Sequence, residues 1–208
     1  MITAVRRSPL ARGQLALGAV VSHEAGWEVT ESFGDERAER QLLLGSVGMA
    51  DVTPRAKVDV RGGIDDAFLP ADGASVARVA SDWGLVLARP GAEAELAPAM
   101  EAAAAPGTMV TDATHLYCGI AIAGPAVSDS LARLTSWDPR TLANGSATAA
   151  PIADVPAIVV RRDLTVLLFE LYVATESGRY VWETILEVVR PLGGGPIGWT
   201  ALRSEGWR

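Results

Sequence analysis

The stretch Val166-Leu-Leu-Phe-Glu-Leu-Tyr-Val173 is the most apolar strand-like run in the chain, and it carries one carboxylate, Glu170, at its centre. Successive side chains of a strand point to opposite faces of the sheet. One face of this strand carries Leu167, Phe169, Leu171 and Val173. Glu170 lies on the second face with Val166, Leu168 and Tyr172. Both faces are mainly apolar, so we expect the strand to be covered on both sides.

A carboxylate in that position is costly unless hydrogen-bond donors reach it. Three arrangements satisfy the Glu170 carboxylate: access to solvent, an ion pair with an arginine such as Arg161 or Arg162 on a neighbouring strand, or a bound ligand with donor groups. The third arrangement says the most about function.

Composition limits the class of protein. With 208 residues, of which 49% are hydrophobic, the chain fits one domain of ordinary to large size or two small ones. A net charge of −7 argues against a nucleic-acid surface, which needs clustered Lys and Arg. The single cysteine, Cys118, excludes an intramolecular disulfide framework.

The sequence also predicts a location. No apolar run approaches the length that spans a bilayer, and the first residues lack the apolar region of a signal peptide. We therefore expect a soluble, cytoplasmic protein with no membrane partner. Lys57 is the single lysine, and the abundance of Ala, Gly and Arg is typical of a high-GC bacterial genome.

Periodicity and turn residues divide the chain into elements. Helices are predicted at 34–44, 92–105, 124–135 and 176–189, with Trp182, Ile185 and Leu186 facing inward in the last. Strands are predicted at 57–61 and 83–88, and hairpins at 108–111 with 115–123 and at 156–161 with 165–174. An irregular segment is predicted at 6–27, a loop at 136–154 and a short tail at 197–208. The order predicts one α+β domain, 1–208, with mixed or antiparallel sheets and helices packed on one face.

Several short segments, in their order and spacing, resemble the glycine-cleavage T-protein (aminomethyltransferase) superfamily. They are Ala25-Gly-Trp-Glu28, Gly48-Met-Ala-Asp-Val-Thr53, Ala56-Lys-Val-Asp-Val-Arg-Gly62, Ile120-Ala-Ile-Ala-Gly-Pro-Ala126, Phe169-Glu-Leu-Tyr-Val173 and Tyr180-Val-Trp182. The first of these fall in an N-terminal segment, 5–62, and residues 83–190 are most similar to the gamma subunit of heterotetrameric sarcosine oxidase. The resemblance implies a T-protein-like folate-binding domain with ferredoxin-like repeats, without the C-terminal barrel of the larger members.

The resemblance also implies a site for tetrahydrofolate. In folate-dependent members, a Glu in the Phe-Glu-Ile/Leu-Tyr strand receives the pterin ring, whose 2-amino group and N3–H form a donor pair that a carboxylate accepts. Glu170 occupies that position, with Tyr172 beside it. Leu202-Arg-Ser-Glu205 resembles the family segment that brings an arginine near the folate, which makes Arg203 a third candidate, although it lies closer to Gly198 than in the family.

The acid–base candidates depart from the family pattern. Full-length members carry a Gly-Gly-x-x-Asp-Asp stretch whose Asp works at folate N10, and that stretch comes well after the corresponding strand. Here a similar stretch, Gly62-Gly63-Ile-Asp65-Asp66, follows the strand directly. We interpret this stretch as a turn and the intervening region as deleted. Asp51 and Asp66 are the catalytic candidates that remain. Asp51 has an alternative role, capping its own turn through backbone hydrogen bonds before Thr53-Pro54.

Other residues predict no further chemistry. His23 and His115 lack partners at ligand spacing, so no metal site is expected. Cys118 is expected to be buried and inert. Trp199 and Trp207 make the tail aromatic, and such a tail is expected to dock on something.

Two functions follow. The first is a folate-binding, aminomethyltransferase-like protein that transfers a one-carbon unit from a methylamine-type donor. The second is a non-catalytic gamma-type subunit of a heteromeric sarcosine or methylamine oxidase, with flavoprotein oxidase subunits as partners; a homo-oligomer is the other partner prediction. A stand-alone enzyme that reuses the fold for different chemistry is a third possibility.

Overall fold

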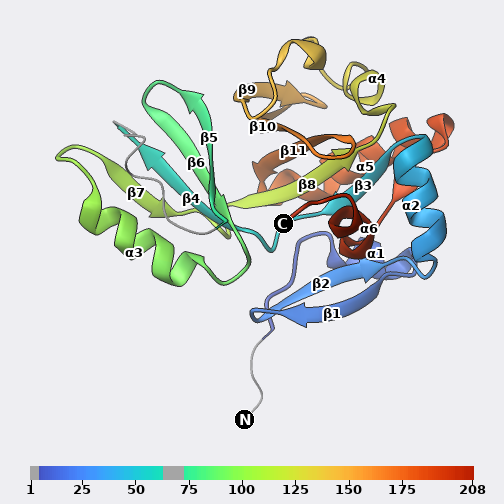
Figure 1. The fold of residues 1–208 in the computed structure, drawn as a ribbon, viewed down its shortest axis with the longest axis horizontal. Coiled ribbons are helices and arrows are strands. Elements are labelled where there is room, and N and C mark those ends of the chain that lie inside the picture. The colour runs from blue at the N-terminus through green and yellow to red at the C-terminus, as the bar shows by residue number, and fades with distance from the viewer. Residues whose placement is uncertain (1–4, 63–72) are drawn as a thin grey trace.

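The computed structural model describes residues 5–62 and 73–208 (Figure 1). The strands are β1 (Val20–Glu24), β2 (Trp27–Ser32), β3 (Gly48–Asp51), β4 (Ala56–Arg61), β5 (Ser75–Ala80), β6 (Trp83–Ala88), β7 (Met109–Asp112), β8 (Tyr117–Ala123), β9 (Ala147–Ile152), β10 (Val155–Asp163), β11 (Leu167–Ala174) and β12 (Gly195–Pro196). The helices are α1 (Ala11–Ala16), α2 (Glu36–Gly45), α3 (Glu93–Ala103), α4 (Val127–Leu131), α5 (Gly178–Val189) and α6 (Trp199–Ser204). Short 3₁₀ turns cover Pro139–Thr141, Thr175–Ser177 and Arg190–Leu192.

The largest sheet has the strand order β12-β3-β8-β11-β10-β9. Strand β11 pairs antiparallel with β8 on one side and with β10 on the other. This central place explains its composition, because a strand with neighbours on both sides and layers above and below presents little surface to water. Phe169 and Glu170, on opposite faces of β11, are both fully buried, so the prediction that the strand is covered on both sides is confirmed.

Helices α4 and α5 cover the first face of this sheet. Phe169, Leu171 and Val173 of β11 belong to the same apolar cluster as Trp182 and Ile185 of α5. The inward residues of α5 recur at helical spacing, which makes one stripe of the helix apolar. The inward orientation predicted for Trp182, Ile185 and Leu186 is confirmed.

Two different layers cover the second face. A four-stranded sheet, in the order β5-β6-β4-β7 with helix α3 beside it, packs on one part; Figure 1 draws these elements in teal (β4) and green. Its Leu85 and Leu87 share a cluster with Tyr172 and Ile158 of the larger sheet. Helix α6, the β1–β2 hairpin and α2 cover the other part, in a cluster that contains Leu168. Glu170 lies along β11 between Leu168 and Tyr172, at the border of the two clusters.

The mixed α+β class is confirmed. The helices predicted at 34–44, 92–105 and 176–189 correspond to α2, α3 and α5. The second predicted hairpin is also confirmed, since β10 and β11 pair antiparallel with Val160 opposite Glu170. Helices pack on both faces of the large sheet, because α6 and α2 join the second-face cluster.

The first predicted hairpin is wrong. Strand β7 pairs with β4 in the four-stranded sheet, whereas β8 pairs with β3 and β11 in the six-stranded sheet. The connection 113–116 therefore passes from one sheet to the other. It is held there by Ala113, whose N–H donates to the Lys57 carbonyl at 2.8 Å, and by Thr114, whose hydroxyl accepts from the Lys57 N–H at 3.1 Å. A turn between two apolar runs has the same sequence pattern whether it closes a hairpin or connects two different sheets.

Four further regions differ from the predictions. Residues 6–27 contain α1, β1 and the first residue of β2. The predicted loop 136–154 contains β9, and the helix predicted at 124–135 is limited to Val127–Leu131. The tail contains the short helix α6. Strand β9 is an edge strand of small residues with Pro151 in it, and such strands carry a weak sequence signal.

Candidate functional site

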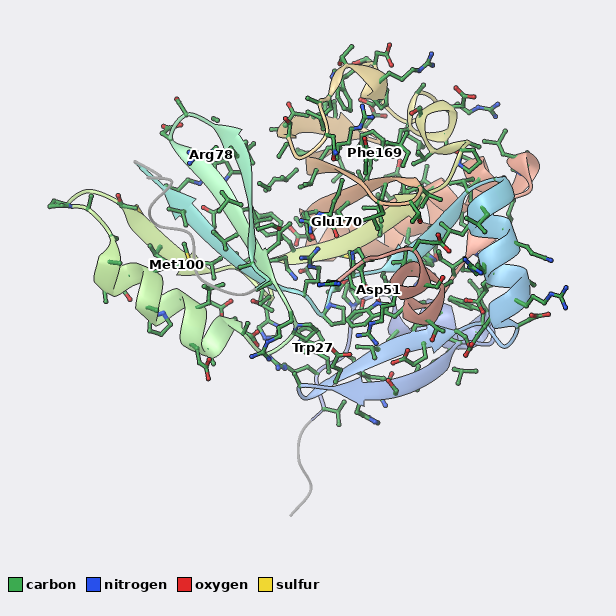
Figure 2. The ribbon with its side chains drawn as sticks, in the orientation of Figure 1. Trp27, Asp51, Arg78, Met100, Phe169 and Glu170 are labelled. Atoms are coloured by element: carbon green, nitrogen blue, oxygen red, sulfur yellow. The ribbon has the colours of Figure 1, made fainter. Side chains whose placement is uncertain are left out.

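Glu170 is the centre of a buried polar group in the middle of the molecule (Figure 2). Its Oε1 accepts hydrogen bonds from Arg55 Nη1 at 2.6 Å and from Trp207 Nε1 at 2.8 Å. Its Oε2 accepts one from the Tyr172 hydroxyl at 3.0 Å, and Arg162 Nη2 lies 3.9 Å away. Glu170 and Tyr172 are 0% exposed, Arg55 1% and Trp207 3%. The carboxylate therefore has an internal partner on each oxygen.

The electrostatics favour an ionised Glu170. Burial by itself raises the pKa of this carboxyl, but the Arg55 and Arg162 guanidinium groups and the donors from Trp207 and Tyr172 outweigh burial, so the pKa is lowered from its ordinary value. Burial and the nearby Glu170 charge raise the pKa of Tyr172, so its hydroxyl stays protonated and donates. The carboxylate is an anion whose acceptor sites point at fixed donors.

The turn between β3 and β4 brings Arg55 to this carboxylate. Asp51 Oδ1 accepts the Thr53 N–H at 2.9 Å, and the Arg55 N–H donates to the Val52 carbonyl at 3.1 Å. The buried Lys57 Nζ donates to the carbonyls of Thr53 and Arg55, both at 2.7 Å. This bracing fixes the backbone from which the Arg55 side chain extends.

Asp51 therefore has the turn-capping role that was the alternative prediction for it, and that alternative is confirmed. Its second oxygen, Oδ2, accepts from Gln14 Nε2 at 3.1 Å, and its backbone carbonyl accepts from Trp199 Nε1 at 2.6 Å. Burial raises the pKa of Asp51, while hydrogen bonds from Ser8, Thr53 and Gln14 oppose the rise. Asp51 lies on β3, which strand β8 separates from β11, so its carboxylate is not part of the Glu170 group.

A pocket of about 330 Å³ adjoins the Glu170 group. It is lined by Glu24, Arg55, Arg89, Pro90, Trp199, Arg203, Trp207 and Arg208. Four of these side chains are arginines and one is a glutamate, so the pocket is cationic. Arg203 Nη2 pairs with Glu24 at 2.5 Å, and its guanidinium lies 4.8 Å from the centre of the Trp199 ring. The pocket thus combines positive charge with aromatic surface.

A larger pocket, of about 500 Å³, lies between α1 and α5. Its lining includes Leu10, Leu17 and Trp182 and none of the residues that contact Glu170. Among residues 5–62 and 73–208, no group of three or more His, Cys, Asp or Glu side chains is arranged to hold a metal ion. The Glu170 group with its cationic pocket is therefore the candidate site.

Of the predicted site residues, two are in contact with each other and a third lines the adjoining pocket. Glu170 and Tyr172 are hydrogen-bonded to each other, and Arg203 lines the adjoining pocket. Asp66 lies outside the described residues. The ion-pair alternative for Glu170 is confirmed for Arg162, whose Nη2 lies 3.9 Å from Oε2, and Arg55, which was not predicted, is the closer arginine at 2.6 Å.

Sequence reasoning missed Arg55, which is separated from Glu170 by 115 positions and carries no pattern that links the two. Trp207 could be anticipated only in part. An aromatic tail was expected to dock, and both Trp199 and Trp207 are buried, but their target was not evident from the sequence.

Fold and site together define a mixed α+β domain that buries an ionised carboxylate beneath an arginine-lined pocket. The model of the GCVT N-terminal domain family matches residues 65–206. The chain belongs to this family, and the resemblance to T-proteins seen in the sequence is confirmed.

Two bacterial aminomethyltransferases are similar to this chain along most of its length. An aminomethyltransferase of Chromobacterium violaceum is 26% identical over 92% of this chain and 47% of its own length. One from Streptomyces avermitilis is 26% identical over 88% of this chain and 57% of its own length. The chain thus spans about half the length of these relatives.

Solved structures show the same fold. The glycine cleavage system aminomethyltransferase T of Bartonella henselae superposes with a TM-score of 0.78 at 17% identity, covering 97% of this chain and 62% of that chain. A chain of the heterotetrameric sarcosine oxidase of Corynebacterium sp. U-96, solved with pyrrole 2-carboxylate, superposes with a TM-score of 0.63 at 16% identity. It covers 90% of this chain and 96% of that chain. None of the helices in the described residues is long and apolar enough to cross a membrane.

Proposed function

We propose that this aminomethyltransferase-like chain binds tetrahydrofolate at Glu170 and takes part in one-carbon transfer from a methylamine-type donor. The observation that carries the proposal is the ionised, fully buried Glu170 carboxylate, which already accepts a ring N–H from Trp207. A carboxylate that accepts an indole N–H in this position is suited to the adjacent N–H donors of a pterin. Arg55 and Tyr172 hold it in one orientation.

The adjoining pocket supports the same ligand class. Folate joins a donor-bearing ring to an aromatic linker and a carboxylate tail, so its binding site needs an acceptor, aromatic surface and positive charge in that order. Here Glu170 is the acceptor, Trp199 lines the pocket beside it, and Arg89, Arg203 and Arg208 supply the charge. Arg203 therefore belongs to the proposed site as a ligand for the tail.

When bound, tetrahydrofolate supplies the amine nitrogens that accept a one-carbon unit. This chain would contribute orientation, with Glu170 holding the ring and Arg55 keeping the carboxylate charged. Acid–base work requires a further group. Asp51 is a positioning residue, because both its carboxylate oxygens accept internal donors. Asp66 is kept as the catalytic candidate.

A titration with tetrahydrofolate tests the proposal. Binding to the native chain should raise its melting temperature by mass action. Glu170→Gln should abolish the rise, because an amide presents both a donor and an acceptor where the ring needs an acceptor pair. Glu183→Gln, which removes an exposed carboxylate on α5, is the matched control and should keep the rise. No rise for the wild-type chain at millimolar tetrahydrofolate would overturn the proposal.

A second function is favoured by one observation. The superposition covers 96% of a chain from a heterotetrameric sarcosine oxidase, so the likeness extends over almost the whole of a subunit of a heteromeric assembly. In that role the fold would serve as an interface to a flavoprotein oxidase subunit. Co-expression with a flavoprotein subunit from the same genome tests it. Recovery of a stoichiometric, flavin-containing complex is the expected result, and a chain that elutes alone would contradict it.

A further inference from the structure

The indole of Trp207 occupies the place at Glu170 that a ligand needs. Oε1 of Glu170 accepts from both Arg55 and Trp207, and Oε2 accepts from Tyr172. Because Glu170 is 0% exposed, an incoming N–H reaches the carboxylate only if a surrounding side chain moves, and these three donors are the side chains bonded to it. The identity of the donor that leaves therefore decides how the site opens.

Arg55 and Tyr172 are the fixed donors. Arg55 carries the closest compensating charge, and its removal would leave the buried Glu170 with only Arg162, at 3.9 Å, as a counter-ion. Tyr172 lies on β11 itself, two residues from Glu170, and its ring is packed in the cluster between the two larger sheets. Neither side chain leaves without disrupting the core.

Trp207 is the donor that can be replaced. It follows α6 and Gly206, whose φ of +95° is a left-handed conformation that glycine adopts without strain. The backbone N–H of Trp207 makes a long bond of 3.3 Å to the Leu202 carbonyl. Glu205, one residue before Gly206, is anchored by Arg40 at 2.8 Å and by Thr165. Rotation about Gly206 therefore moves the indole while α6 stays in place.

The indole also separates the carboxylate from the arginine-lined pocket. Trp207 and Arg55 both line that pocket, and both bond to Glu170. The Trp207 ring lies edge-on to Trp199 at 5.0 Å and 5.5 Å from the Arg55 guanidinium. Arg55 Nε is buried and has no hydrogen-bond partner among residues 5–62 and 73–208, so the guanidinium retains a donor that these residues do not use. Displacing Trp207 joins the pocket and the carboxylate into one cavity.

We propose that Trp207 is an internal competitor for the Glu170 site and sets its affinity. This rests on the proposed function, since the competing ligand is a heteroaromatic ring with adjacent N–H donors and an anionic tail. The tail enters the arginine-lined pocket and the ring replaces the indole on Glu170. The apparent affinity of the native chain is then reduced by the fraction of molecules in which Trp207 is bound to Glu170.

Calorimetric titration of tetrahydrofolate, under reducing conditions, into three proteins tests the competitor. Trp207→Phe keeps an aromatic ring against Trp199 and removes the indole N–H. Trp137→Phe changes a tryptophan that packs on the opposite face of the sheet and is the control. We expect Trp207→Phe to bind about tenfold more tightly than wild type, in line with the loss of one hydrogen bond to a charged acceptor. The control should match wild type.

The outcomes separate the two ideas. Equal affinity in all three proteins overturns the competitor role and leaves folate binding intact. Absence of binding in all three overturns the proposed function and the competitor with it. A measurement on the wild-type chain covers the case in which the variant does not fold. The Trp207 indole N–H resonance should shift on saturation with tetrahydrofolate, and an unchanged resonance overturns the proposal.

Discussion

Glu170→Gln should destabilise the chain far more than the loss of an ordinary surface charge. The substitution keeps the size and shape of the side chain and removes its charge. Arg55, which is 1% exposed, then becomes a buried cation that has lost its close counter-ion. The amide oxygen can keep the bonds from Arg55 and Trp207 while the amide nitrogen donates to the Tyr172 hydroxyl, so the loss is that of the negative charge.

The expected magnitude is about 3–5 kcal/mol of unfolding free energy, the usual cost of breaking a buried ion pair from one side. Arg55→Met alone should also destabilise, because it leaves the carboxylate without its close cation. The double variant Glu170→Gln/Arg55→Met should cost less than the sum of the two, with a coupling of roughly 1–3 kcal/mol. Such a difference is a large part of the stability of a typical domain.

Denaturant unfolding followed by tryptophan fluorescence measures these differences. Glu183→Gln breaks the exposed Arg179–Glu183 pair on α5 and should leave the midpoint unchanged. Since the pKa of Glu170 is lowered, its contribution is present above its ordinary value of 4.5 and is lost as the pH falls below it. The gap between wild type and Glu170→Gln should therefore shrink in acid. A midpoint for Glu170→Gln equal to that of the control would refute the reasoning.

Three other predictions follow from buried groups. Burial lowers the pKa of Lys57 to about 7 from 10.5, so the unfolded chain binds more protons between these values and stability rises with pH across that window. From pH 7 to 9 the wild-type chain should gain about 2 kcal/mol relative to Lys57→Met in denaturant titrations, and parallel curves would contradict this. Burial raises the pKa of Cys118 to about 12, so a thiol reagent should react with it only in denaturant. Rapid reaction of Cys118 with the reagent in the native chain would contradict this prediction. Gly198→Ala places a Cβ 1.9 Å from the Glu31 carbonyl oxygen and should cost about 1–3 kcal/mol or more, whereas Gly13→Ala, with open space around it, should not lower the melting temperature.

Local patterns predicted the parts of the fold that depend on local order. The strand around Glu170 and the helix with Trp182 have strong periodicity, and both are where the sequence placed them. The connection after Asp112 could not be predicted, because a hairpin turn and a passage between sheets share one signature. Strand β9 was missed because small residues and Pro151 at a sheet edge resemble a loop.

The candidate site, like the fold, was predictable only where neighbours in the sequence decide the outcome. The cost of burying Glu170 was evident from its neighbours in sequence, and so was the need for a partner. The partners themselves come from distant segments, Arg55 from the β3–β4 turn and Trp207 from the residues after α6. Only tertiary structure brings such residues together. The role of Asp51 could be anticipated as an alternative, since Asp before Thr53 forms a local turn.

A crystal structure of the chain with bound tetrahydrofolate tests the central claim most directly. The account predicts that the pterin 2-amino group and N3–H lie within about 3 Å of the Glu170 carboxylate oxygens. It also predicts that the Trp207 indole has left Glu170, while Arg55 and Tyr172 keep their bonds to it. A folate bound elsewhere, with Trp207 still on Glu170, would contradict the account.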